Sequence, residues 1–200
     1  MASAIETARE VFRDHGGALR TSEALADGIH PRTLYAMRDA GEIEQLAWGL
    51  YRLVELPPLS EPDLATVGKR IPQGVVCLIS ALAYHELTTQ VPHEVHLALP
   101  RTARRPRLAY PPLHVYRFSR EAFEAGVETH TIDRMSVRIY DPAKTVADCF
   151  KYRNKVGLDV ALEALRDCWH QRKASMDELW KYAKTCRVAN VIRPYLESLT

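Results

Sequence analysis

The 200-residue sequence has no long apolar run, no large excess of charge of either sign and no cysteine pair spaced for a metal or disulfide framework. No segment approaches the ~20 apolar residues of a membrane-spanning helix. Glu6, Arg9 and Glu10 interrupt the first residues, which excludes the apolar core of a signal peptide. Because the four cysteines form no CxxC pair, we expect reduced thiols and no bound metal. Because the sequence shows neither a membrane span nor a signal peptide, we expect no membrane partner and a cytoplasmic protein.

The charge balance excludes a histone-like polycation, because 27 basic and 25 acidic side chains leave a net charge of +2. Hydrophobic residues make up 46% of the chain, which suffices for one large or two small globular domains. The balance does not exclude nucleic-acid binding, since phosphates are contacted by a local basic face rather than by the total charge.

Glycine and proline are distributed unevenly. Five of the nine glycines lie in the first 49 residues, whereas ten of the twelve prolines lie from Pro57 to Pro142. Consecutive prolines at 57 and 58 end a strand and cannot continue a helix. We therefore predict two domains, over residues 1–55 and 56–200.

In the first domain, apolar spacing and glycine stops predict three helices and a β-hairpin. The helices are expected over 5–15, 21–27 and 31–40, and the strands over 43–47 and 50–53. Thr21 is the expected N-cap of the second helix, Pro31 the first residue of the third, and Trp48-Gly49 the hairpin turn.

The second domain is predicted to be mixed α/β with a helical end, which makes the whole chain α+β. The expected elements are a helix over 60–70 that Ser60 caps, strands over 75–79, 94–99, 114–118, 129–132 and 137–140, and a helix over 141–152. Ser80 is the expected cap of a further helix, and the last forty residues are expected to be helical.

Three helices followed by a hairpin is the order of a winged helix-turn-helix, in which the third helix enters the DNA major groove. At about 100° per residue, Leu34 and Met37 face inward, Thr33 lies at the edge, and Arg38 lies close to the buried side, where it donates to a phosphate or carboxylate. The candidate DNA-binding residues are Arg32, Thr33, Tyr35, Ala36 and Arg38 on the helix and Trp48 and Arg52 on the hairpin. A solvated helix face or a protein-binding module is the alternative, and it is favoured by the net charge of −3 over residues 1–55.

Three motifs carry a family resemblance: GALRTSEAL at 17–25, GIHPRTLY at 28–35 and GEIEQLAWGLYRL at 41–53. They resemble the N-terminal domain of AbiEi-family antitoxins of bacterial type IV toxin-antitoxin operons, and the likeness continues more loosely at 78–87 and 141–148. The resemblance implies a winged helix that represses its own operon at inverted-repeat operator DNA. It also implies a C-terminal domain that counteracts a nucleotidyltransferase-like toxin, directly or indirectly, with no enzymatic activity of its own. Gln45 and Trp48 stand where basic residues are expected in many relatives.

An enzymatic C-terminal domain, of nuclease or other type, is the alternative. A restriction-type nuclease needs an Asp/Glu-x-Lys pair to hold its cation, and the sequence contains none. His93 and His96 are interpreted as ordinary histidines on opposite strand faces, and Asp148 is expected to pair with Lys144 one helical turn away. With no GxGxxG, P-loop or GxSxG motif either, we predict no catalytic residues and no cofactor.

Four arginines, Arg101, Arg104, Arg105 and Arg107, form an arginine-rich segment between two expected strands. Three interpretations are open: a solubilising loop, backbone contact to operator DNA, or contact with the toxin or its nucleotide or RNA substrate. Arginine suits each binding role because its planar guanidinium pairs bidentately with phosphate and carboxylate.

Overall fold

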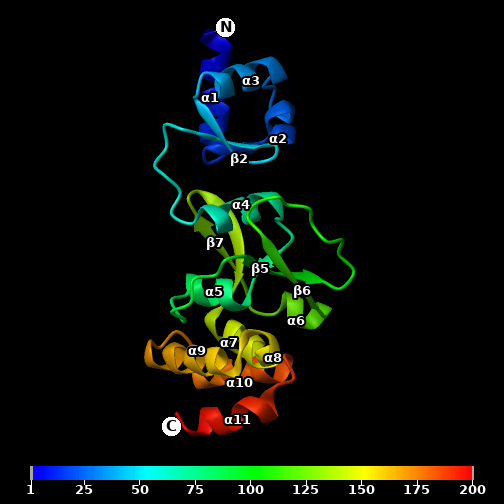
Figure 1. The fold of residues 1–200 in the computed structure, drawn as a ribbon, viewed down its shortest axis with the longest axis vertical. Coiled ribbons are helices and arrows are strands. Elements are labelled where there is room, and N and C mark those ends of the chain that lie inside the picture. The colour runs from blue at the N-terminus through cyan, green and yellow to red at the C-terminus, as the bar shows by residue number, and fades with distance from the viewer. Residues whose placement is uncertain (1, 200) are drawn as a thin grey trace. The chain divides into compact units, whose positions relative to one another are not determined.

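The computed structural model describes residues 2–199 and divides into two compact units (Figure 1). The N-terminal unit contains the chain up to Pro72 together with residues 107–111 and 131–137, and the C-terminal unit contains the remainder. The helix that follows Pro57-Pro58 thus groups with the N-terminal elements, whereas the boundary expected from composition lies between residues 55 and 56.

The N-terminal unit contains the expected three helices and hairpin, followed by a fourth helix. Its elements are α1 (Ala2–Asp14), β1 (Ala18–Arg20), α2 (Thr21–Ala26), α3 (Pro31–Asp39), β2 (Ile43–Ala47), β3 (Leu50–Leu53) and α4 (Pro62–Arg70). The strands form an antiparallel sheet in the order β1-β3-β2. The hairpin bounds agree with the sequence prediction, which missed β1.

Two expected helix caps are corrected. Strand β1 pairs with β3 up to Arg20, so α2 starts directly after it, and the backbone N–H of Arg20 donates to the Glu23 carboxylate at 2.9 Å. Thr21 is therefore the first helical residue rather than the N-cap. Helix α4 likewise starts at Pro62, with Glu61 at its N-cap position, so Ser60 is not the cap. The N–H and hydroxyl of Ser60 donate instead to the Asp133 carboxylate at 2.9 and 3.0 Å.

The core of the N-terminal unit forms where α1 and α3 pack on the sheet. Phe12, Leu19, Leu34, Met37 and Leu53 are fully buried there. Leu34 and Met37 are the two apolar positions of α3 that the helical period places on one face. Their burial fixes the orientation of α3 and leaves its opposite face in solvent.

The C-terminal unit is an α/β arrangement that ends in helices, so the α+β class is confirmed. Its elements are β4 (Val75–Val76), α5 (Leu78–Tyr84), β5 (Val95–Pro100), β6 (Leu113–Phe118), α6 (Arg120–Glu124), β7 (Val127–Ile132), β8 (Met135–Tyr140), α7 (Pro142–Lys151), α8 (Arg153–Val156), α9 (Leu158–His170), α10 (Met176–Thr185) and α11 (Ala189–Glu197). The end of β7 and the start of β8, within residues 131–137, group with the N-terminal unit. The sheet order is β6-β5-β4-β8-β7, with β5 parallel to β6 and β4 parallel to β8.

The strand expected over 75–79 is wrong beyond Val76. Cys77 adopts an extended backbone and caps α5, which begins at Leu78. Ser80 lies inside this helix, where its hydroxyl accepts from the His96 backbone N–H at 2.9 Å. A short apolar run favours a strand and a buried helix equally, and here the run is divided between the two.

Helix α7 follows the sequence prediction closely. The Asp141 carboxylate accepts from the backbone N–H of Lys144 at 2.7 Å and caps the helix. The expected pair of Lys144 with Asp148 is confirmed at 2.5 Å, with both side chains fully buried. All four cysteines are buried free thiols, and no helix of residues 2–199 is long and apolar enough to cross a membrane.

Candidate nucleic-acid interface

Helix α3 presents a polar face because its start and its buried side are both fixed. Pro31 is its first residue, and the His30 side chain accepts from the backbone N–H of Arg32 at 3.1 Å. With Leu34 and Met37 buried, the side chains of Arg32, Tyr35 and Ala36 are exposed and Thr33 lies at the edge. The orientation predicted from the helical period is confirmed for all of these residues.

Arg32 differs from the other arginines of residues 1–55 in its surroundings. The others donate to protein acceptors: Arg9 to Glu6 and Glu42, Arg13 to Glu55, Arg20 to the Lys69 carbonyl, Arg38 to Asp39, and Arg52 to Glu44. Within residues 2–199, the guanidinium of Arg32 has no carboxylate partner. Most carboxylates of this segment thus have a basic partner, whereas Arg32 is left available for an external anion.

Arg38 is more exposed than the sequence prediction expected. Its guanidinium donates to the Asp39 carboxylate at 2.7 and 2.9 Å and lies 5.1 Å from the centre of the Tyr35 ring. The hydrogen bond and charge of Asp39 raise the pKa of Arg38. The expectation that it donates to a carboxylate is confirmed, whereas its placement near the buried side is wrong.

The two hairpin candidates have opposite environments. Trp48 is 84% exposed at the turn, whereas Arg52 is only 5% exposed. The Arg52 guanidinium donates to the Glu44 carboxylate at 2.7 Å, to the Leu56 carbonyl at 2.9 Å and to the Pro57 carbonyl. These bonds hold β3, the central strand, to residues 56 and 57 and occupy the guanidinium donors. Arg52 is therefore removed from the candidate interface.

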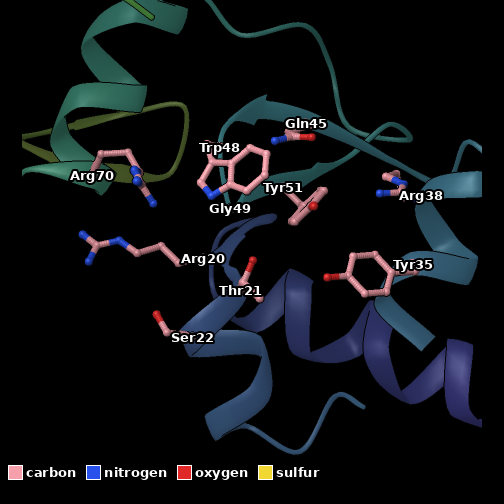
Figure 2. Close-up of a pocket in the computed structure, with 10 residues that line it drawn as sticks. All are labelled: Arg20, Thr21, Ser22, Tyr35, Arg38, Gln45, Trp48, Gly49, Tyr51 and Arg70. Atoms are coloured by element: carbon pink, nitrogen blue, oxygen red, sulfur yellow. The ribbon is translucent and has the colours of Figure 1, made fainter. Parts of the chain in front are cut away.

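A groove of about 460 Å³ lies beside the exposed face of α3 (Figure 2). It is lined from six elements and from the hairpin turn by Arg20, Thr21, Ser22, Tyr35, Arg38, Gln45, Trp48, Gly49, Tyr51 and Arg70. In Figure 2, Arg20 and Arg70 lie on one side of this groove and Tyr35 and Arg38 on the other. Aromatic and cationic side chains in one groove are the combination that binds a nucleic-acid backbone and its bases.

The charge of the groove is positive because no carboxylate is among its lining residues. Arg70 has no ion-pair partner in the described part of the chain. Burial acts to raise the pKa of Glu23, but the hydrogen bonds from Arg20 and Lys69 lower it overall, so this nearby carboxylate is ionised and paired. The groove therefore has no carboxylate in its wall, and it offers an anion the guanidinium of Arg70 together with that of Arg38, which also contacts Asp39.

Sequence reasoning missed Arg20, Thr21, Ser22 and Arg70 as lining residues. The first three lie in the GALRTSEAL motif, which carried the family resemblance but was not assigned to a surface. Arg70 lies in α4, and no spacing in the sequence connects that helix to the hairpin.

The arginine-rich segment, residues 101–107, forms most of an extended connection between β5 and β6. Its four guanidinium groups are exposed, and none has a carboxylate partner among residues 2–199. The start of the segment is held by Arg117, which donates to the carbonyls of Pro100 and Ala103 at 3.0 and 2.7 Å. A held backbone with free cationic side chains is compatible with each binding role considered above.

Residues 6–54 match the family model described as "Transcriptional regulator, AbiEi antitoxin". Residues 6–54 are thus similar to AbiEi-type regulators and are called the AbiEi-type segment below. The matched range runs from α1 to the end of the hairpin and covers most of the α3 and hairpin surface described above, so the resemblance seen in the motifs is confirmed there.

The fold of the chain beyond the AbiEi segment also has a counterpart. The structure is similar to the crystal structure of the RV2827C protein from Mycobacterium tuberculosis, with a TM-score of 0.62 and 14% sequence identity. The similarity covers 92% of this chain and 72% of that one. At this identity it shows the fold alone. No curated protein matches the sequence.

Proposed function

We propose that this protein is a transcriptional regulator that binds operator DNA through the exposed face of α3 and the adjacent groove. The observation that carries the proposal is the unpaired Arg32 on the outward face of a helix within the AbiEi-type segment. The first turn of a recognition helix is where side chains usually meet base edges, and an arginine there bridges O6 and N7 of guanine.

The residues divide into two roles. Arg32, Thr33, Tyr35 and Ala36 form the part that reads bases. Arg20, Arg38 and Arg70, with the exposed indole of Trp48, form the part that contacts phosphates and sugars. Phosphate contacts position the protein on the duplex, whereas base contacts select the sequence.

The test is binding of the full chain to duplexes from the region upstream of its own gene, measured by fluorescence anisotropy. Arg32→Ala is expected to weaken binding by about 1–3 kcal/mol and to relax the base preference at one position of each half-site. Arg120→Ala removes another exposed helical arginine, from α6, and is the matched control, expected to leave binding unchanged. If Arg32→Ala binds every operator variant as the unaltered protein does, the assignment of α3 is wrong.

We further propose that the protein is the autorepressor and antitoxin of a type IV toxin-antitoxin pair and counteracts a nucleotidyltransferase-like toxin, without catalytic activity of its own. Support comes from the description of the matched family and from a second compact unit that lies outside the residues matched by the family model. The proposed operator is an inverted repeat, because two copies of this chain related by a two-fold axis would place their α3 helices in two symmetric half-sites.

Co-expression tests the antitoxin role. The full chain is produced together with the nucleotidyltransferase-like protein encoded beside it, and growth is compared with cells that carry the toxin alone. Arg32→Ala is expected to keep the protective effect while losing repression of a reporter fused to the upstream region. No protection by a chain that still represses the reporter would contradict the antitoxin role and leave the regulator role standing.

A further inference from the structure

Glu94, His96 and His114 converge on one face of two paired strands in the C-terminal unit. Strands β5 and β6 are parallel and place His96 opposite His114. Glu94 precedes His96 by two residues, and side chains two apart along an extended chain share a face. Each residue offers one ligand atom, and these atoms all lie within 4.8 Å of one another.

His96 is the unusual member of this cluster. It is only 7% exposed, and its Nδ1 atom has no hydrogen-bond partner among residues 2–199. Buried polar atoms without partners are rare in folded proteins and call for an explanation such as a missing ion or water. Its backbone is held by the Ser80 hydroxyl, which accepts from its N–H at 2.9 Å. Burial, and then the nearby His114, lower the pKa of His96 to about 4, so the imidazole is neutral near pH 7.

Glu94 and His114 complete the donor set from the solvent side. The His114 Nδ1 atom lies 2.8 Å from a Glu94 carboxylate oxygen, and both side chains are partly exposed. Glu94 and His96 also line an open pocket of about 340 Å³, together with Gln90, His93 and Pro112 among others. An ion therefore has a route from solvent and an unfilled side that faces the pocket.

We propose that Glu94, His96 and His114 bind one divalent ion of the zinc type, with a fourth position open to the pocket. Two imidazoles and a carboxylate are a donor set that zinc uses, at about 2.0–2.2 Å from each donor atom. Tetrahedral donors are then roughly 3.3 Å apart, so side-chain rotation brings the present arrangement to that geometry. Imidazole donors disfavour Mg²⁺ and Ca²⁺, which select oxygen ligands.

The site has a defined mechanical effect. Strand β6 is at the edge of the five-stranded sheet, and the ion joins it to β5 through side chains as well as through backbone hydrogen bonds. A ligand that binds only the folded state stabilises that state. The spacing of His93 and His96 did not indicate this site, because the histidine that joins His96 is His114, on the neighbouring strand β6.

The experiment uses the full chain freed of metal with a chelator and titrated with Zn²⁺ by isothermal calorimetry. One equivalent of Zn²⁺ is expected to bind and to raise the Tm. Glu94→Gln and His114→Ala, both at partly exposed positions, are each expected to weaken the affinity by more than about tenfold. His170→Ala removes an exposed histidine of α9 and is expected to bind Zn²⁺ as the unaltered chain does.

Cobalt substitution separates the proposed site from the cysteines. Co²⁺ bound by nitrogen and oxygen gives visible d–d bands without the near-ultraviolet charge-transfer band of a thiolate, and His114→Ala is expected to remove these bands. Circular dichroism of the metal-free variants verifies that they fold. Absence of stoichiometric Zn²⁺ binding, unchanged affinity in both variants or a thiolate band would overturn the proposal. None of these results depends on whether the chain binds DNA.

Discussion

Arg32 and Arg52 belong to the same N-terminal segment and have opposite surroundings. Arg32 stands on an exposed helix face without a carboxylate partner in the described residues 2–199, whereas Arg52 is buried and donates to Glu44 and to two carbonyls. In the sequence both are arginines in elements of a winged helix. Burial and pairing separate a side chain available for DNA from one that holds the fold.

The buried pair of Lys144 and Asp148 offers a prediction about stability. Burial raises the pKa of Asp148, and the charge and hydrogen bond of Lys144 oppose this, so each charge depends on the other. Asp148→Ala leaves an ammonium group buried without its partner and is expected to cost about 3–5 kcal/mol of unfolding free energy in urea titrations. Replacing both residues together, as Lys144→Met with Asp148→Leu, is expected to recover most of that loss.

The exposed pair of Arg120 and Glu124 is the matched control, because it has the same four-residue spacing on a helix. Glu124→Ala is expected to change the unfolding free energy little, since solvent screens such a pair. Equal losses of unfolding free energy for Asp148→Ala and Glu124→Ala would contradict the prediction that burial makes the Lys144–Asp148 pair costly to break.

His85 provides a pH prediction. Burial is the main cause that lowers its pKa below 6.5, the His130 ring adds to this, and the hydrogen bond with the Tyr140 carbonyl at 2.7 Å acts in the opposite direction. The unfolded chain therefore binds a proton at His85 more readily than the folded chain does. Stability is expected to fall as the pH drops below 6.5 and to be independent of this group above it.

His85→Gln isolates that contribution. Unfolding free energies measured between about pH 5 and pH 7 are expected to depend less on pH in the variant than in the unaltered protein. Parallel pH curves for the two proteins would contradict the lowered pKa of His85.

The bounds of helices and strands were predicted correctly from the sequence where neighbouring residues alone specify the local backbone conformation. The hairpin around Trp48-Gly49 has the predicted bounds because a glycine with φ of +65° and alternating strand residues specify the turn locally. Strand β1 was missed because three residues carry no periodic pattern and extend only by pairing with β3. Short elements whose stability comes from a distant partner are not visible in the sequence.

The N-cap of α7 leads to a prediction about one element. Asp141→Ala removes the carboxylate that accepts from the Lys144 backbone N–H and is expected to cost about 1 kcal/mol of unfolding free energy. Asp141→Asn keeps an acceptor and is expected to lose much less. Ser119→Ala is the control, because Ser119 precedes α6 without a capping hydrogen bond from its side chain. A loss at Ser119 as large as that at Asp141 would contradict the capping role.

For the molecule as a whole, charge is unevenly distributed along the chain. Residues 1–55 carry −3, residues 56–120 carry +4 and residues 121–200 carry +1. Residues 1–55 are therefore acidic in total, and the charge of −3 is what remains after their ion pairs, because each pair is neutral. The surplus positive charge lies in the middle of the sequence, where the arginine-rich segment presents four exposed side chains.

We predict that this segment adds phosphate contacts to those of the groove. Replacing Arg101, Arg104, Arg105 and Arg107 together by serine is expected to weaken DNA binding equally for all sequences. The slope of log affinity against log salt is expected to fall by about 0.9 for each phosphate that the variant no longer neutralises, as measured by anisotropy over a salt series. Arg32→Ala in the same series is expected to alter base preference instead. An unchanged slope in the serine variant would contradict DNA contact by this segment and leave the solubilising role and contact with the toxin or its substrate.

The sequence by itself determined most of the helices and strands, the inward residues of α3, the start of α7 and the similarity of residues 6–54 to AbiEi-type regulators. These depend on periodicity, turn residues and motifs, which act over a few neighbouring positions. Only the tertiary structure decided that Arg52 is buried, that Arg70 lines the groove and that His114 lies beside His96. Each of these depends on which distant segments pair or pack, and no local pattern of residues carries that information.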